Sequence, residues 1–188
     1  MLDKNTEQYH FLRPSVKAAI DFFKEEKRTN LHVVEVGLYF GHHAQQMIDG
    51  MPEIDKLYGV DIESKEYSGI ITSDKIEKLV PMTSIQASKL FPDESLDFVY
   101  VDGSHCYEDV KNDLDYWWPK LKWHSVMGGH DYAPLFQGVA DAVDGFAKRL
   151  GLPVCHHLEY VPYQKVDAQY QPWCSDWWIY KIKPSEWK

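Results

Sequence analysis

Short apolar runs alternate along the chain with segments that have helical periodicity. Three runs, at residues 31–36, 56–61 and 96–101, are rich in β-branched and aromatic side chains and are typical of strands buried in a parallel sheet. Helices are expected where apolar residues recur every three or four positions, at residues 14–28, 42–48, 107–121 and 139–150. This alternation of strand and helix predicts a three-layer α/β sandwich built on a mostly parallel sheet.

Two parts of the chain have a less regular pattern. Residues 62–81 predict a loop that ends in a short helix around 74–79, and residues 82–85 predict a third strand. In the helix expected after the third apolar run, Tyr107 falls on the apolar face and Asp113 falls on the opposite, polar face.

The C-terminal part predicts a hairpin. Two strand candidates, at residues 154–161 and 177–182, alternate in polarity like an antiparallel pair at the edge of the sheet. The length of the chain suits one domain with a sizeable core. We therefore expect a single domain over residues 1–188, in which 1–30 form a lead-in and the first helix and 31–188 form the core.

The charge and cysteine content argue against several classes of partner. A formal net charge of −9 leaves no basic face to displace counterions from a phosphate backbone, so we expect no nucleic-acid partner. The three cysteines are widely spaced and form no CxxC pair, which favours the reducing cytoplasm over a disulfide framework. We expect no membrane association, because no apolar run approaches membrane-spanning length and the first residues lack a signal-peptide core. A small-molecule partner fits this composition best.

Polar side chains follow two strands that are expected to be neighbours. Asp102 and His105 come directly after the third apolar run, and His130 and Asp131 follow the next short apolar piece at residues 125–127. Because a right-handed crossover joins these strands, their carboxyl ends meet at one edge of the sheet, where open α/β sheets bind ligands. Two carboxylates and two imidazoles should therefore converge there. The structural alternative is a simple turn at Asp102 and a buried, hydrogen-bonded His130.

A glycine pattern, Glu35-x-Gly37-x-x-x-Gly41, follows the first strand, and Asp61 ends the second. Glycine lets the backbone pass close to a ligand, and the helix start offers N–H groups to an anion. The pattern departs from the dinucleotide fingerprint, because Tyr39 occupies the place of the middle glycine and would crowd a pyrophosphate. A carboxylate such as Asp61 can accept both hydroxyls of a ribose. Together with Glu35, which suits a positively charged ligand, these features favour S-adenosylmethionine over NAD.

Several segments match one family pattern: residues 34–37 with Gly41, 59–61, 96–107, 113–114, 118–121 and 128–132. The specific part is the order and spacing of the DGSHxY motif at residues 102–107 and the GGHDY motif at residues 128–132. On these residues the chain resembles the class I S-adenosylmethionine-dependent methyltransferases. Within that class it is similar to the small enzymes related to macrocin and other sugar O-methyltransferases.

The resemblance implies a Rossmann-like sheet of seven strands with an antiparallel C-terminal hairpin, and it implies a set of cofactor contacts. The residues expected to contact S-adenosylmethionine are Glu35, Gly37, Gly41, Asp61, Ile62, Ser84 and Asp102. The two glycines would bracket the methionine part, and Asp61 would bind the ribose. Ile62 and Ser84 would lie beside the adenine, next to Thr83, which stands where an Asp is frequent in relatives.

The resemblance also implies methyl transfer to a hydroxyl group. A sugar hydroxyl is a very weak acid, and a bound Mg²⁺ would lower its pKa and fix its position. Asp102 and Asp131 are the expected oxygen ligands. His130 suits Mg²⁺ poorly, so it would either favour a softer ion such as Mn²⁺ or simply form a hydrogen bond. His105 is the candidate general base, and Asp102 is the second residue expected at the reaction.

The expected function is divalent-metal-assisted O-methylation of a sugar or another polyhydroxylated small molecule. Two alternatives stay open: a metal-independent methyltransferase that uses His105 as its base, and a non-catalytic cofactor-binding protein on the same fold. Acceptor specificity should reside in residues 62–81, in the segment after Tyr132 and in residues 163–178. Because the first of these is short for a lid, the cleft would be open or completed by a second chain of a homo-oligomer.

Overall fold

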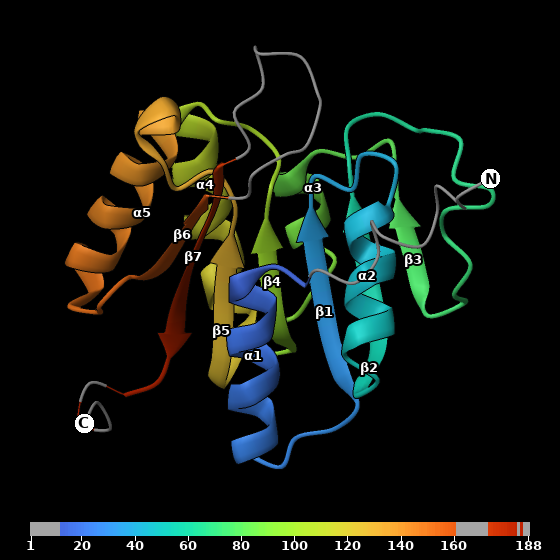
Figure 1. Cartoon of the computed structure of the whole chain (residues 1–188), viewed down its shortest axis with the longest axis horizontal. Helices are drawn as coiled ribbons and strands as arrows, with labels where there is room; N and C mark the ends of the chain where they lie inside the picture. The colour runs from blue at the N-terminus through green and yellow to red at the C-terminus, as the bar shows by residue number, and fades with distance from the viewer. Residues whose placement is uncertain (1–11, 161–172, 184, 186–188) are drawn as a thin grey trace.

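The computed structural model describes residues 12–160, 173–183 and 185, and within them strands alternate with helices (Figure 1). The strands are β1 (Leu31–Val36), β2 (Ile54–Val60), β3 (Ile76–Leu79), β4 (Leu96–Val101), β5 (Leu121–Gly129), β6 (Cys155–Tyr160) and β7 (Trp173–Lys181). The helices are α1 (Pro14–Glu25), α2 (His42–Gly50), α3 (Ser84–Ser88), α4 (Tyr107–Trp117) and α5 (Gln137–Leu150), with short 3₁₀ helices η1 (Trp118–Lys120) and η2 (Pro134–Phe136). The expected lead-in before residue 12 and residues 163–172 of the expected specificity segment lie outside the described residues.

All seven strands belong to one sheet, in the order β3-β2-β1-β4-β5-β7-β6. The first five strands in the chain are parallel, and β7 runs antiparallel between β5 and β6. The predicted Rossmann-like, mostly parallel sheet with an antiparallel C-terminal hairpin is confirmed. The strand order reverses between β1 and β4, so a ligand crevice is expected at the carboxyl ends of these two strands.

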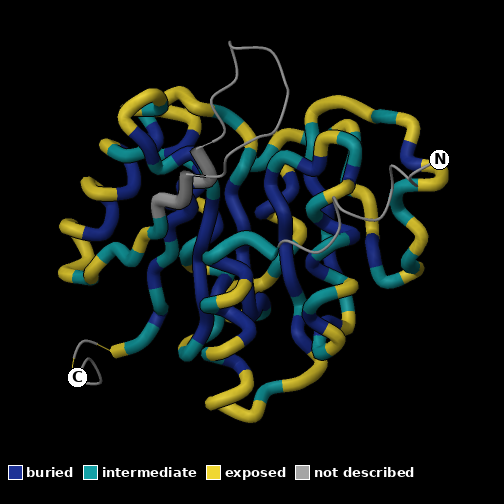
Figure 2. The backbone as a smooth tube through the Cα atoms, in the orientation of Figure 1, coloured by how far each residue is buried: buried dark blue, intermediate teal, exposed yellow. Residues whose placement is uncertain are grey.

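The sheet divides the hydrophobic core into two halves. On one face α1 and α2 bury side chains such as Phe23 and Met47, and on the other α4 and α5 bury Trp117 and Phe146 (Figure 1). Every residue of β4 is buried, which makes this strand the centre of the molecule, and the strands form the dark interior of Figure 2. The predicted three layers are thus present. None of the helices within the described ranges could span a bilayer.

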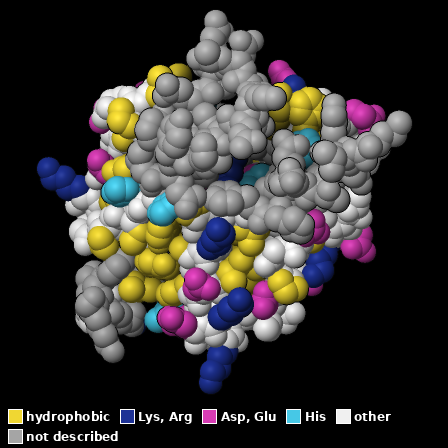
Figure 3. Space-filling model, in the orientation of Figure 1, with side chains coloured by type: hydrophobic (Ala, Val, Ile, Leu, Met, Phe, Trp, Pro, Cys, Tyr) yellow, Lys and Arg dark blue, Asp and Glu magenta, His cyan; other side chains and the backbone are white. Residues whose placement is uncertain are grey.

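The surface carries charges of both signs. Lys and Arg side chains are interspersed with Asp and Glu on the face shown in Figure 3. Among the residues drawn in colour, this face therefore presents no continuous basic surface, as a net charge of −9 leads one to expect.

Two predictions within residues 74–85 are wrong, because a strand forms where a helix was expected and a helix forms where a strand was expected. Ile76–Leu79, expected to be helical, forms β3 and pairs in parallel with β2 at the edge of the sheet. The expected strand is replaced by α3, which begins after Thr83 because Thr83 and Gln86 form a reciprocal capping box.

Helix α4 also differs from its predicted orientation. Tyr107, expected on the apolar face, is 42% exposed, whereas Asp113, expected on the polar face, is only 5% exposed. The reason is that α3 contacts this side of α4, and the Ser84 hydroxyl of α3 is hydrogen-bonded to Asp113. The buried surface of α4 therefore extends beyond the apolar stripe that the sequence displays.

Candidate functional site

The turn after β1 lies directly against the end of β4. Gly37 has a φ of +93°, and a Cβ atom on it would lie 2.0 Å from the backbone oxygen of Asp102. Only glycine permits this approach, because a side chain would overlap the neighbouring backbone. The Gly37 N–H also donates to the carbonyl oxygen of Val60, 2.8 Å away at the end of β2. The glycine turn thus brings the ends of β1, β2 and β4 together.

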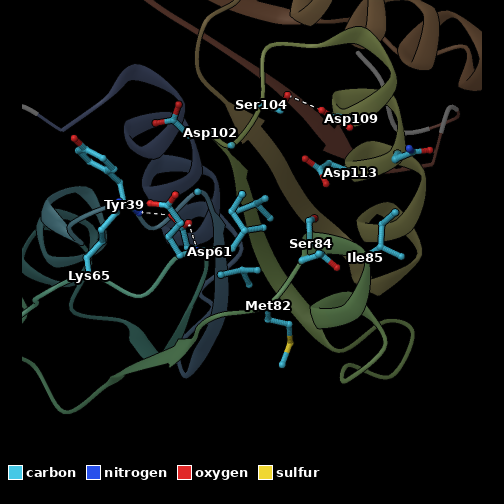
Figure 4. A pocket seen from close by; sticks show the side chains of 18 residues that line it. Tyr39, Asp61, Lys65, Met82, Ser84, Ile85, Asp102, Ser104, Asp109 and Asp113 are labelled. Atoms are coloured by element: carbon cyan, nitrogen blue, oxygen red, sulfur yellow. Dashed lines mark hydrogen bonds and ion pairs between the residues drawn. The ribbon is translucent and has the colours of Figure 1, made fainter.

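A cavity of about 810 Å³ lies over these three strand ends. Its lining includes five of the residues that the sequence places at a cofactor, namely Gly37, Asp61, Ile62, Ser84 and Asp102 (Figure 4). The volume is within the range of about 300–1,000 Å³ that is usual for small-molecule and cofactor sites.

Asp61 lies on one side of the cavity, next to the glycine turn (Figure 4). One of its carboxylate oxygens accepts the N–H of Tyr39 at 2.7 Å, and the other accepts the N–H of Glu63 at 3.0 Å. Both bonds fix the orientation of the carboxylate, and each oxygen keeps a lone pair for another donor. The arrangement can therefore accept both hydroxyls of a ribose, as the sequence predicts.

The opposite side of the cavity contains an acid that sequence reasoning missed. Asp113 of α4 lines the cavity beside Ser84 (Figure 4). The Ser84 hydroxyl oxygen accepts the indole N–H of Trp117 at 2.8 Å. Burial raises the pKa of Asp113 to about 6, although the Ser84 hydrogen bond lowers it somewhat. The sequence signal that could have revealed Asp113 is the polar stripe that it forms on α4 with Asp109 and Asn112, both of which line the cavity.

Two residues expected at the cofactor do not line the cavity. Glu35 is 1% exposed, and its Oε1 lies 2.6 Å from Nδ1 of His43. Burial, reinforced by the charge of Asp102, raises the pKa of Glu35 well above its usual value. Gly41 starts α2 with a φ of +85°, and a Cβ atom on it would overlap the side chain of Ile71.

A second polar cluster adjoins the cavity at Asp102. Single ligand atoms of Asp102, His130 and Asp131 all lie within 4.8 Å of one another. Oδ1 of Asp131 is 3.0 Å from Nδ1 of His130, and its Oδ2 is 2.8 Å from Nε2 of His105. The structure thus brings together the four side chains that the sequence predicts at this edge of the sheet.

The environment of Asp131 favours its ionised form. Burial by itself would raise the pKa of this carboxyl group, but the hydrogen bond to His130 and the positive charge of His130, His105 and Arg13 lower it below its usual value. A lone carboxylate in this place would be costly to bury, so the hydrogen bond to His130 and the charge of Arg13 help to keep it ionised.

Arg13 is the residue of the cluster that sequence reasoning did not find. Its Nη1 donates to Oδ2 of Asp102 at 2.7 Å and to the hydroxyl of Tyr100 at 2.5 Å. It directly precedes α1, whose residue Ser15 donates through its N–H and its hydroxyl to the buried Asp176 of β7, at 3.0 and 2.5 Å. The start of α1 is therefore held by Asp102, which follows β4, and by Asp176 within β7. No local pattern marks Arg13, because its partner Asp102 is 89 residues away.

The cluster can accommodate a divalent cation with mixed ligands. Asp102 and Asp131 offer carboxylate oxygens, and His130 offers an imidazole nitrogen. Arg13 occupies one oxygen of Asp102, while Oδ1 of the same carboxylate faces Nδ1 of His130 at 3.9 Å. A set with nitrogen suits Mn²⁺ or a similar transition ion better than Mg²⁺, which prefers oxygen ligands.

Comparison with known families accounts for this arrangement. The model of a family described as "Methyltransferase domain" matches residues 34–132, a little over half of the chain. The chain belongs to this methyltransferase domain family. The matched segment contains Asp61, Asp113, the glycine turn and the acids and histidines of the cluster, whereas Arg13 and Asp176 lie outside it.

Solved structures share the fold of this methyltransferase domain. The O-methyltransferase from Bacillus cereus, solved in complex with SAH (S-adenosylhomocysteine), has a TM-score of 0.61 at 12% identity, over 92% of this chain and 83% of that one. Precorrin-6y C5,15-methyltransferase from Geobacter metallireducens has a TM-score of 0.61 at 15% identity, over 88% and 87%. Spermidine synthase from Thermotoga maritima has a TM-score of 0.61 at 12% identity, over 86% and 60%. Because enzymes with different names share this fold, the fold does not identify the substrate.

One curated protein matches a short part of the methyltransferase domain. The uncharacterized protein y4gI of Sinorhizobium fredii is 40% identical over 57 residues, which is 30% of this chain. The match spans only 6% of the length of that protein. This relative therefore shares one stretch of sequence and indicates no acceptor.

Proposed function

We propose that the chain binds S-adenosylmethionine in the cavity and transfers its methyl group to a hydroxyl of a sugar or another polyhydroxylated small molecule. The observation that carries this proposal is the position of Asp102, which lines the cavity and also belongs to the cluster with His130 and Asp131. A donor in the cavity and an acceptor at the cluster would meet at this residue. The similarity of the DGSHxY and GGHDY motifs to the macrocin-related enzymes is the reason for choosing a sugar-like acceptor.

The cavity offers a suitable contact for each part of the cofactor. Asp61 would accept the ribose hydroxyls, and Gly37, which lines the cavity, would lie beside the amino-acid part. Ile62 is 68% exposed and lines the cavity, so a bound base would cover an apolar side chain that otherwise faces water.

We place a divalent cation, Mn²⁺ in preference to Mg²⁺, on Asp102, Asp131 and His130. A cation bound there would lower the pKa of the acceptor hydroxyl and hold its oxygen in line with the methyl group. Arg13 holds Oδ2 of Asp102 and leaves Oδ1 towards His130, and its own positive charge would oppose that of the cation.

His105 is suited to remove the proton of the acceptor hydroxyl. Its side chain is 50% exposed, and its ring lies against Phe136 with centroids 4.3 Å apart. When His105 is neutral and donates its Nε2–H to Asp131, its Nδ1 is left as a proton acceptor. Asp131 would then orient the base and select its tautomer, as the third member of a triad does.

The test separates cofactor binding from metal binding. SAH binding to the full chain is measured by calorimetry, and Mn²⁺ binding by electron paramagnetic resonance. Asp131→Asn should weaken Mn²⁺ binding at least tenfold and leave the Kd for SAH within about threefold, because Asp131 does not line the cavity. Asp141→Asn, at an exposed position on α5, serves as the matched control and should change neither value. Absence of Mn²⁺ binding to the wild-type chain would remove the metal from the proposal.

A metal-independent reaction is the second candidate. Arg13 already supplies a positive charge to Asp102, and the pair of His105 with Asp131 is complete without an ion. This candidate predicts turnover that EDTA does not reduce and that His105→Gln abolishes. A non-catalytic role predicts SAH binding together with no methyl transfer to any member of a broad panel of sugars, polyols and amines.

A further inference from the structure

One acid of the cavity has an unusual set of partners. Asp61 is held by two backbone N–H groups and Asp102 by the guanidinium of Arg13. Within the described part of the chain, the side chain of Asp113 is hydrogen-bonded only to the hydroxyl of Ser84 and forms no ion pair. It is 5% exposed and faces the cavity from the side opposite Asp61 (Figure 4). A buried carboxylate with so few donors is costly to keep ionised, and a ligand that supplies another donor would offset part of that cost.

The direction of the hydrogen bonds behind Asp113 is determined by the indole of Trp117. The indole N–H can only donate, and it lies 2.8 Å from the oxygen of Ser84. The single proton of the Ser84 hydroxyl is then free to point at Asp113. Asp113 therefore accepts a hydrogen bond from the Ser84 hydroxyl and presents its remaining acceptor positions to the cavity.

The position of Asp113 indicates which part of a cofactor it would meet. Asp61 accounts for the ribose on one side, and the turn at Gly37 accounts for the amino-acid part. The adenine of the cofactor would then lie against the remaining wall, which contains Ser84 and Asp113 (Figure 4). Thr83, another polar residue that lines the cavity, uses its hydroxyl in the capping box with Gln86. Adenine differs from hypoxanthine on this edge by carrying an amine in place of a carbonyl oxygen.

We propose that Asp113, positioned by Ser84 and Trp117, accepts a hydrogen bond from the exocyclic amine of the cofactor's adenine and so selects adenine over oxo-purines. This inference rests on the proposed function, since it requires S-adenosylmethionine in the cavity. Hypoxanthine would place its carbonyl oxygen against the carboxylate, so two acceptors would face each other without a proton between them.

Calorimetry on the full chain with two ligands tests the proposal. The ligands are SAH and S-inosylhomocysteine, which carries the carbonyl oxygen. The wild-type chain should bind SAH about 10- to 100-fold more tightly, the range expected when a buried acceptor loses its donor. Asp113→Asn should reduce this ratio to about one or invert it. The proton of Ser84 would hold the carbonyl oxygen of the new asparagine, and the amide N–H₂ would then face the cavity and donate to the inosine carbonyl.

The control is a second acid on the same wall. Asp109 also lines the cavity, but its carboxylate is bonded to the Ser104 hydroxyl at 2.8 Å. Asp109→Asn makes the same change of charge and should leave the ratio of the two dissociation constants unchanged. If Asp113→Asn fails to fold, Ser84→Ala replaces it and should reduce the ratio, because it removes the group that orients Asp113.

The outcomes distinguish this inference from the proposed function. Tight binding of SAH with an equally tight binding of S-inosylhomocysteine to the wild-type chain would overturn the role of Asp113 and leave the proposed function intact. Absence of binding of both ligands would overturn both. An equal loss of selectivity in the Asp109→Asn control would show that the charge of the wall sets the preference, and that a hydrogen bond accepted by Asp113 does not.

Discussion

Replacing Arg13 with glutamine would remove the positive charge beside Asp102 and keep a polar side chain of similar length. The pair is only partly exposed, with 24% of the Arg13 side chain and 20% of the Asp102 side chain accessible. Exposed pairs contribute about 0–1 kcal/mol, and breaking a buried pair costs about 3–5 kcal/mol. We therefore expect Arg13→Gln to lower the free energy of unfolding by about 1–3 kcal/mol, which for a chain of this size lowers Tm by roughly 2–12 °C.

The same substitution should strengthen cation binding. In the proposed site the cation shares Asp102 with the guanidinium, so the two positive charges repel each other. A unit charge and a divalent charge about 6 Å apart in a water-like medium repel by about 1.4 kcal/mol, which is about tenfold in affinity. Arg13→Gln should therefore be less stable than the wild-type chain and yet bind Mn²⁺ about ten times more tightly.

Thermal unfolding without metal and Mn²⁺ titration by electron paramagnetic resonance measure the two quantities. Arg28→Gln is the matched control, because Arg28 pairs with Asp97 at the opposite end of β4, and Asp97 is 1% exposed. This variant should lose stability without any change in Mn²⁺ affinity. A fall in both stability and Mn²⁺ affinity for Arg13→Gln would refute the reasoning, since it would mean that Arg13 builds the cation site and does not oppose it.

Three further substitutions test local features of the structure. Burial raises the pKa of Asp113 from its ordinary value of 3.8 to about 6, so its ionisation destabilises the folded chain above pH 6 and this cost disappears as the pH falls towards 4. In urea unfolding, the free energy of unfolding of Asp113→Asn minus that of the wild type should be up to about 3 kcal/mol larger at pH 8 than at pH 4. A difference that does not depend on pH would contradict the burial of that charge. Gly37→Ala should lower the free energy of unfolding by at least about 3 kcal/mol and abolish SAH binding, because its Cβ would lie 2.0 Å from a backbone oxygen. Gly145→Ala, in α5 with no atom within 4 Å of the new Cβ, should instead raise stability by about 1 kcal/mol, and a loss would show an unrecognised contact.

The central strands could be predicted residue by residue because their signal is local. The runs at 31–36 and 96–101 coincide with β1 and β4, whose burial on both faces requires continuous apolar sequence. The edge strand β3 could not be predicted in this way. Its two central residues are exposed, so the apolar pattern is interrupted, and pairing with β2 decides its conformation. The capping residues Thr83 and Gln86 were a readable signal for α3 that the apolar pattern obscured.

In the site, too, some residues could be predicted from local sequence and others are placed only by tertiary packing. Asp61, Asp102 and Asp131 could be predicted because each follows a strand, and the parallel topology brings such positions to one edge of the sheet. Arg13 and Asp113 could not be predicted from the same rule. Arg13 reaches Asp102 because α1 docks on the sheet, and Asp113 reaches the cavity because α3 covers the polar side of α4. Both positions depend on how helices pack. The polar stripe of α4 marks a face that contains Asp113, but it does not tell what that face packs against.

The electrostatic environment of Asp102 depends on residues inside and outside the matched segment. The segment that matches the methyltransferase domain family, residues 34–132, supplies the cavity and the acids and histidines of the cluster. The charge balance of the cluster also depends on Arg13, and the position of Arg13 depends on the contact of Ser15 with Asp176. These three residues lie outside that segment. A relative with identical strand-end motifs but a different start of α1 would therefore hold Asp102 in a different electrostatic environment. We expect the requirement for a cation to vary with the residue at the position of Arg13, even where the DGSHxY and GGHDY motifs are unchanged.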